Sequence, residues 1–166
     1  MAFYAPLVGI ITNIETIRTN LGQTKDCTLL LTLEGEEPSG IFQVQLNPNT
    51  YVMNLHPFQV GDRATFFYDA NAPMVLIYPP RYTAAAGAYT PHGTSAMMDV
   101  FLENLHSSDH SLMLNLSRNT PVITANGQPF MGNPAGHLLL VYYSMTTRSI
   151  PPQTSPEQVV VFCQKQ

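Results

Sequence analysis

The stretch CTLLLTL at residues 27–33 decides the fold class, because its residues alternate over the whole length. The cysteine and three of the leucines share one side, and Thr28, Leu30 and Thr32 share the other. The stretch IFQVQL at residues 41–46 repeats the arrangement, with Phe, Val and Leu on one side and two glutamines on the other. A period of two is typical of a β-strand. Both stretches are therefore predicted to be strands.

Short apolar runs between turn residues continue along the chain, and no sustained helical period interrupts them. Pro48-Asn49-Thr50 begins an irregular or one-turn helical segment that reaches Gln59, and Asn49 is its candidate cap, because Asn is favoured there. The pattern predicts an all-β protein. Further strands are expected at residues 7–17, 63–69, 74–78, 97–105, 110–116, 121–125, 137–143 and 158–163.

The stretch TAAAGAYTPHGTS at residues 83–95 is small and uncharged, which is typical of a linker. It divides the chain into a first β-barrel at residues 1–82 and a second, trimmed β-barrel at residues 96–166. In the second part, Asn126-Gly127 predicts a tight hairpin turn, since such a turn requires positive φ.

The two halves share motifs in the same order, which indicates an internal repeat. DCTLLLTL at residues 26–33 aligns without a gap with DHSLMLNL at residues 109–116, and Asn-Thr at 49–50 matches Asn-Thr at 119–120. We expect the matched leucines to be equivalent and buried in both halves: Leu29, Leu31 and Leu33 with Leu112, Leu114 and Leu116.

The expected elements give five strands per half, with a long first strand and an irregular segment between the third and fourth. This order resembles the OB-fold, a five-stranded Greek-key barrel. The resemblance covers residues 6–82 well and 96–163 less well, and it implies two tandem OB-like barrels. TTRSIPPQ at residues 146–153 is similar to the closing-strand region of small bacterial β-domain proteins, which carry no activity that could be transferred.

The composition is apolar and poorly charged. Hydrophobic residues make up 45% of the chain and charged residues 11%, against roughly 25% charged in a typical globular domain. The net charge is −4, and the seven Lys and Arg residues are scattered. Phosphate-backbone binding needs clustered cations, so nucleic acid is an unlikely partner. Two cysteines, Cys27 and Cys163, lie in apolar runs and are expected to be buried free thiols.

The first residues contain no basic region followed by a long apolar run, so no signal peptide is expected. No stretch approaches the ~18 apolar residues of a membrane span. A cytoplasmic protein without a membrane partner is the default expectation.

Candidate chemistry is sparse. His106 and His110 flank Ser107-Ser108 between two expected strands, so a polar turn is favoured over a metal pair, although metal binding by these histidines stays open. No nucleophile motif or glycine-rich phosphate loop occurs, and the acids at residues 34–37 suit an exposed turn. We therefore expect no enzyme activity, no cofactor and no metal.

Aromatic residues of the first half supply the candidate ligand site. In OB-folds, bases or sugar rings stack on aromatics of the second and third strands and the adjoining loops. The outward positions here are polar or aliphatic instead, which departs from the nucleic-acid pattern, and most aromatics suit the core. The candidate ligand-binding residues are Tyr51, Phe67, Tyr78, Arg81 and Tyr82.

The expected function is that of a non-catalytic binding or assembly module acting through β-barrel surfaces. The alternative is an OB-type binder of single-stranded nucleic acid or an oligosaccharide. The apolar composition predicts a homo-oligomer that uses residues 74–78, residues 158–163 or the aromatic surface of the first barrel. The small-molecule ligand, if one exists, is not identified by any motif.

Overall fold

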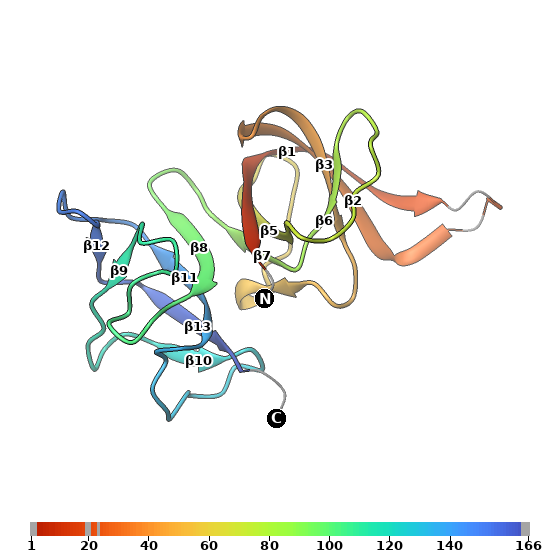
Figure 1. Cartoon of the computed structure of the whole chain (residues 1–166). Helices are drawn as coiled ribbons and strands as arrows, with labels where there is room; N and C mark the ends of the chain where they lie inside the picture. The colour runs from red at the N-terminus through yellow and green to blue at the C-terminus, as the bar shows by residue number, and fades with distance from the viewer. Residues whose placement is uncertain (1–2, 19–20, 23, 164–166) are drawn as a thin grey trace. The chain divides into compact units, whose positions relative to one another are not determined.

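A computed structural model describes residues 3–18, 21–22 and 24–163. The chain divides into two compact units, Met1–His92 and Gly93–Gln166 (Figure 1). Strands dominate both units, and the helical structure of the described residues is one 3-10 turn, η1 (Met53–Leu55). The prediction of an all-β protein is confirmed.

The first unit is one sheet of seven strands in the order β4-β7-β5-β1-β2-β3-β6. The three longest strands form an antiparallel meander, β5 adds antiparallel to β1, and β6 adds parallel to β3. The strands are β1 (Tyr4–Arg18), β2 (Thr24–Glu37), β3 (Ser39–Leu46), β4 (Tyr51–Val52), β5 (Arg63–Asp69), β6 (Arg81–Thr83) and β7 (Ala86–Tyr89).

Two consecutive residues bond to β3 and β5, which are not neighbours in this sheet. The Ala84 amide donates to the Gln45 carbonyl at 3.0 Å, beside β3, and the Ala85 amide donates to the Phe67 carbonyl of β5 at 2.7 Å. The chain thus leaves β3 and reaches β5 within one residue, which curls the sheet (Figure 1). The sheet does not close into a barrel, because β6 pairs with β3 alone.

The core of the first unit lies inside this curl. Leu31 and Leu33 of β2, Phe42 and Val44 of β3, and Phe66 of β5 are all at most 1% exposed. These positions alternate along each strand, which follows from the period of two of a pleated sheet. The core therefore holds the concave face of the sheet together.

The second unit has a sheet in the order β10-β13-β11-β8 and a separate parallel pair, β12-β9. Its core gathers Phe101, Leu139, Val141, Val159 and Val161, each at most 1% exposed. The strands are β8 (Ser95–Val100), β9 (Met113–Leu114), β10 (Val122–Thr124), β11 (Leu138–Tyr143), β12 (Gln153–Thr154) and β13 (Gln158–Phe162).

A tight turn is present at Asn126-Gly127, but the expected turn requires positive φ at both positions, and of these two residues only Gly127 has it. Gly127 has φ of +84°, and its amide donates to the Thr124 carbonyl at 2.9 Å. The Thr124 amide donates to the Gln128 carbonyl at 2.8 Å, which closes the turn.

The structure differs from the expected pair of five-stranded barrels, and the matched motifs form unlike elements. The segment 26–33 lies in the long antiparallel β2, whereas the segment 109–116 contributes the two-residue β9, which pairs in parallel with β12. Leucine alternation is common to both, but strand length and pairing depend on partners elsewhere in the chain. The two units are both all-β, but their strand orders differ.

The segment 83–95, expected as a linker, instead carries β7 and the first residue of β8. Its residues Ala84, Ala86 and Ala88 are at most 2% exposed. The small side chains fit a crowded part of the core rather than a flexible connection. The boundary between the units falls after His92.

Two other expected elements differ. Residues 74–78 form an exposed loop with no strand partner, bracketed by Pro73 and Pro79-Pro80. The segment after β3 is a turn in which the Asn47 side chain accepts the Asn49 amide at 2.8 Å. Asn49 therefore does not cap η1, whose N-cap residue is Val52.

Burial of the matched leucines is confirmed at Leu31, Leu33, Leu112 and Leu114. Leu116 is half-buried against the second core, and Leu29 is 38% exposed. Leu29 pairs with Leu46, the last residue of β3, and beyond it β2 continues in a two-stranded hairpin with β1. Cys27 lies in that hairpin and is exposed, as is Cys163. The expectation of buried thiols is wrong. Cys27 lies in the part of β2 that pairs with β1 alone, and Cys163 follows the last residue of β13, so neither is covered by further strands.

Candidate functional site

A groove of about 700 Å³ opens in the first unit beside β6. One wall, the β6 wall, comes from β6 and the end of β3, and consists of Gln45, Asn47, Asn49, Arg81, Tyr82, Thr83, Ala84 and Ala85. The other, the loop wall, comes from the end of β5 and the loop that follows it, and consists of Tyr68, Asp69, Ala72, Pro73, Met74, Val75 and Ile77. The groove therefore lies between β6, which pairs with β3 alone, and the end of β5 with the loop that follows it.

Two tyrosines meet in the groove, one from each wall. The rings of Tyr68 and Tyr82 have centroids 4.6 Å apart at an interplanar angle of 47°, and Tyr82 also meets the edge of Phe42 at 6.0 Å. Phe42 belongs to the core, so the pair is anchored from below. Burial, and then the neighbouring Tyr68, raise the pKa of Tyr82 above its usual value. A tyrosine phenol is neutral near pH 7 even without this shift, and it can donate or accept a hydrogen bond.

Arg81 is the cation of the groove. It is held from β3, where Gln43 is its register partner, and its Nε and Nη2 donate to Gln43 Oε1 at 3.3 and 3.1 Å. In the part of the chain that the structure describes, the ion pairs are His56–Asp62 and Arg63–Glu36, and neither involves Arg81. A fixed guanidinium with a neutral partner can still bind an anion.

Asp69 places one negative charge on the loop wall. Its Oδ1 accepts the amide of Asn71 at 2.9 Å, which fixes the start of the loop. The groove therefore carries one cation and one anion on different walls. Its ligand would need local charge complementarity rather than a large net charge.

The loop wall exposes apolar side chains. Met74, Val75 and Ile77 line the groove and are 44%, 73% and 45% exposed. Leu76 and Tyr78 do not line it, and they are 98% and 86% exposed. The loop thus has a groove side and an outer side, and both are apolar.

The five predicted ligand-binding residues do not all lie in the groove. Arg81 and Tyr82 line the groove, whereas Tyr78 belongs to the outer side of the loop. Phe67 is 1% exposed and is a core residue. Tyr51 lies half-buried in β4, and burial raises its pKa. The groove thus contains two of the five residues.

Sequence reasoning missed most of the other lining residues. The sequence predicts a strand at residues 74–78, which belong to the irregular loop, and it assigns Asn49 as the cap of a one-turn helical segment and not as a groove residue. The proline residues at 73, 79 and 80 were the available signal, because proline cannot donate to a ladder and marks a long irregular connection.

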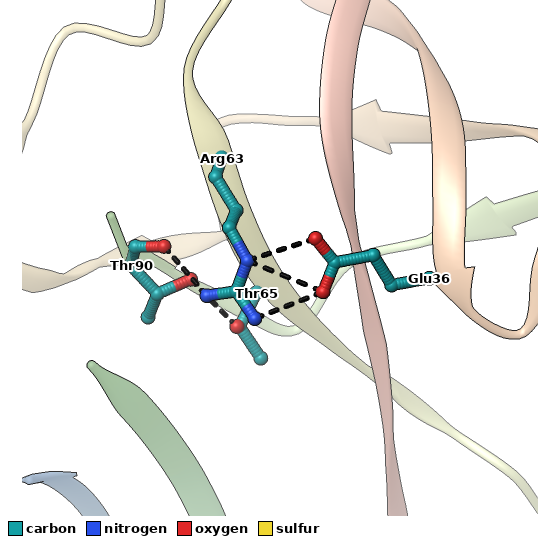
Figure 2. Close-up of polar contacts among 4 residues, drawn as sticks. All are labelled: Glu36, Arg63, Thr65 and Thr90. Carbon is teal, nitrogen blue, oxygen red and sulfur yellow. Dashed lines mark hydrogen bonds and ion pairs between the residues drawn. The ribbon is translucent and has the colours of Figure 1, made fainter. Parts of the chain in front are cut away.

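A second polar cluster is structural (Figure 2). Arg63 donates through Nε and Nη2 to the Glu36 carboxylate at 3.0 and 2.9 Å, and through Nη1 to the Thr90 carbonyl at 2.8 Å. The hydroxyls of Thr65 and Thr90 are 2.8 Å apart and buried. This cluster joins the end of β2 to β5 and to the residue that follows β7.

His56 and Asp62 form a second pair next to this cluster, since Asp62 directly precedes Arg63 in the sequence. His56 Nε2 lies 2.9 Å from Asp62 Oδ2, and the imidazole stacks on Tyr89 with centroids 4.4 Å apart and planes at 4°. Asp62 Oδ2 also accepts the amide of Gln59 at 3.0 Å. The pair therefore fixes the segment after η1 against β7.

His106 and His110 lie in a polar turn of the second unit, as favoured from the sequence. Ser107 and Ser111 donate to Asp109 Oδ1 at 2.6 and 2.7 Å. Burial raises the pKa of Asp109, but these hydrogen bonds together outweigh burial and lower it. Over the described ranges of the chain, no group of three or more His, Cys, Asp and Glu side chains is placed to hold a metal ion.

Comparisons outside the chain give no further assignment. Within residues 3–18, 21–22 and 24–163, no helix has the length and apolar character needed to cross a membrane. Protein-family models, curated proteins and solved structures give no match to this chain.

Proposed function

We propose that this chain is a non-catalytic binding module whose first unit takes its ligand in the groove beside β6. The observation that carries the proposal is the groove itself, in which Tyr68, Tyr82 and Arg81 meet an apolar loop wall. Ligand sites are typically concave, about 300–1,000 Å³ in volume, and mostly apolar with a few placed polar groups. The volume and the mixture of side chains both fit that description.

The strand pairing supports an OB-type first unit. A meander of β1, β2 and β3, with a fourth long strand antiparallel to the first and a final strand parallel to the third, is the order of an OB-fold. Here β6 and β7 together take the place of that final strand. OB-folds bind ligands at the second and third strands and at the loops between strands one and two and between four and five. The loop wall belongs to the latter connection.

The OB-type alternative, a binder of single-stranded nucleic acid or an oligosaccharide, has unequal support. Gln45, Asn47 and Asn49 on the β6 wall are neutral donors and acceptors, which suits sugar hydroxyls. Nucleic acid would need several cations, and the groove offers Arg81 beside Asp69. The oligosaccharide is therefore the better-supported part of that alternative.

The groove can be tested by nuclear magnetic resonance on the full chain. Backbone amide spectra would be recorded during titration with a panel of short peptides, oligosaccharides and nucleotides. We expect at least one class to shift resonances of Gln45, Asn47, Tyr68 and residues 81–85. Binding confined to the second unit, or no binding by any class, would contradict the proposal.

A matched pair of variants sharpens the test. Val75 lines the groove and is 73% exposed, whereas Val60 is 62% exposed and does not line it. Val75→Arg should obstruct the ligand, and Val60→Arg should not. Both changes add the same charge and bulk to an exposed valine, so a difference between them reports on the groove.

The predicted homo-oligomer would use residues 74–78, residues 158–163 or the aromatic surface of the first unit. Residues 158–162 form β13, which pairs with both β10 and β11 and so offers no edge to a second copy. Residues 74–78 stay available through their outer side. We therefore propose a homo-oligomer through that loop or through the aromatic surface of the first unit.

A further inference from the structure

We propose that the ligand of the groove is an extended peptide that pairs with β6 as an added strand and places one carboxylate on Arg81. This inference rests on the proposed function and names its ligand class. Three features of the first unit carry it: the free edge of β6, the spacing of its backbone groups, and the position of Arg81.

The register between β3 and β6 shows which backbone groups are in use. The Gln43 amide donates to the Pro80 carbonyl at 2.8 Å, and the Ala84 amide donates to the Gln45 carbonyl at 3.0 Å. In a parallel pair, alternate residues turn both backbone groups toward the partner. Pro80, Tyr82 and Ala84 therefore face β3, and the amides and carbonyls of Arg81 and Thr83 face away from it.

That outer side of β6 is an open sheet edge along the groove. β6 ends the sheet order, so no strand of the described residues pairs with Arg81 or Thr83 there. Both residues line the groove. An exposed edge with alternating donors and acceptors is a template for another strand, and extended peptides bind to such edges in many recognition domains.

The spacing favours a peptide over a sugar. Arg81 and Thr83 are two residues apart, which places equivalent groups about 6.6 Å from one another along a strand. An extended peptide repeats its own donor and acceptor with that period on one side. A sugar offers hydroxyls without a fixed alternation, so it would use the amides of the β6 wall and leave the edge unpaired.

Arg81 selects the charge of the peptide. Its guanidinium is oriented by the neutral Gln43 side chain, so a ligand carboxylate would add a charge-assisted hydrogen bond without displacing an ion pair. Asp69 on the loop wall would repel a second acid. The apolar side chains of Met74, Val75 and Ile77 favour apolar neighbours. The expected ligand is thus a largely apolar strand with a single acidic residue.

The charge is tested by selection and a double-mutant cycle. A display library of random octapeptides would be selected on the full chain, and the most enriched sequence synthesised with blocked ends. We expect an acidic residue at a fixed position. Replacing it with its amide in the peptide, or Arg81→Gln in the protein, should each weaken binding by about tenfold or more, and the two changes together should cost little more than either alone.

Arg118→Gln is the control, because Arg118 is exposed and lies in the second unit. Retained amide dispersion would show that Arg81→Gln is folded, and Arg81→Lys provides a second folded variant if it is not. Enriched peptides without an acid, or additive effects of the two changes, would overturn the role of Arg81.

Strand pairing is tested by hydrogen exchange with the same peptide. Binding should slow exchange of the Arg81 and Thr83 amides strongly, and should change that of Tyr82 much less, because Tyr82 already pairs with β3. A bound peptide that leaves Arg81 and Thr83 unprotected would overturn strand addition.

The two proposals fail differently. If an oligosaccharide or a nucleotide shifts the groove resonances and no selected peptide does, the peptide is wrong and the binding groove stands. If neither shifts them, both proposals are wrong.

Discussion

Arg63 holds the carboxylate of Glu36 in a two-pronged ion pair, with Nε to Oε1 at 3.0 Å and Nη2 to Oε2 at 2.9 Å (Figure 2). The two residues come from β5 and the end of β2, which do not pair with each other in the sheet. The hydrogen bond from Arg63 has the largest effect on the pKa of Glu36 and lowers it; burial opposes this effect, and the charges of Arg63 and His92 lower the pKa further. This contact therefore joins two strands across β1.

The first prediction concerns acid stability. A carboxyl whose pKa is lowered by folding contributes stability that is present above its ordinary pKa and is lost as the pH falls through the lowered value. Glu36→Gln should reduce the free energy of unfolding at pH 7 by less than about 1 kcal/mol, because exposed ion pairs are weak. The difference from wild type should shrink as the pH falls below the ordinary glutamate pKa, and it should vanish once the pH lies below the lowered pKa of Glu36. Urea titrations at several pH values measure it.

Glu34→Gln is the matched control, since Glu34 is an exposed acid of the same strand. It should leave the free energy of unfolding nearly unchanged at every pH. Equal effects of the two substitutions would mean that net charge, and not the Arg63 contact, sets the pH dependence.

The second prediction concerns Gly87, which is the register partner of Phe66 and lies against its ring. A Cβ at Gly87 would lie 2.6 Å from Phe66 Cδ1 and 2.7 Å from Cε1. Phe66 is fully buried and cannot swing away. Gly87→Ala should therefore lower the free energy of unfolding by about 1–3 kcal/mol, the usual cost of overpacking a core. Chemical denaturation of the single variant measures it.

A double-mutant cycle identifies the cause. In a Phe66→Leu background the ring edge is gone, so Gly87→Ala should cost clearly less than in the wild type. Equal costs in both backgrounds would show that something other than the Phe66 ring requires glycine at this position.

Gly87 also explains why β7 could not be predicted. Residues 83–88 are all small, and a run of small residues suggests a flexible linker. In the structure, residue 87 is glycine because the Phe66 ring occupies the space that a larger side chain would need, and not because the segment is flexible. Crowding by a residue twenty or so positions away is not visible in local composition.

Strands built from β-branched, aromatic or alternating apolar residues were predictable. Residues 63–69 coincide with β5 and residues 41–46 lie within β3. By contrast, the run at 74–78 has the composition of a strand but no partner, and it forms the loop wall. A strand needs a neighbour to satisfy its backbone, and pairing partners are set by the whole topology. Arg81 and Tyr82, two of the predicted ligand-binding residues, line the groove, but the groove between the two walls could not be predicted.

The third prediction concerns self-association through the outer side of the loop. Leu76 and Tyr78 are 98% and 86% exposed, and neither lines the groove. Exposed apolar clusters of this kind favour contact with another copy. We expect light scattering to give a mass above 18.3 kDa that rises with concentration. Leu76→Asp with Tyr78→Ser should lower it toward the monomer.

The control for self-association is Met131→Asp, since Met131 is 92% exposed and lies in the second unit. A monomer mass for the wild type over a wide concentration range would contradict the prediction. An assembly that persists in the loop variant would place the contact elsewhere.

The last prediction concerns nucleic acid. Affinity for a phosphate backbone comes from several cations that displace counterions together. This chain has seven Lys and Arg residues and a net charge of −4. Arg63 is paired with Glu36, and Arg81 shares its groove with Asp69. A labelled oligothymidylate should therefore show no submicromolar binding by fluorescence anisotropy at ~150 mM salt, and only weak binding at ~50 mM. Submicromolar affinity that falls steeply with salt would contradict the prediction.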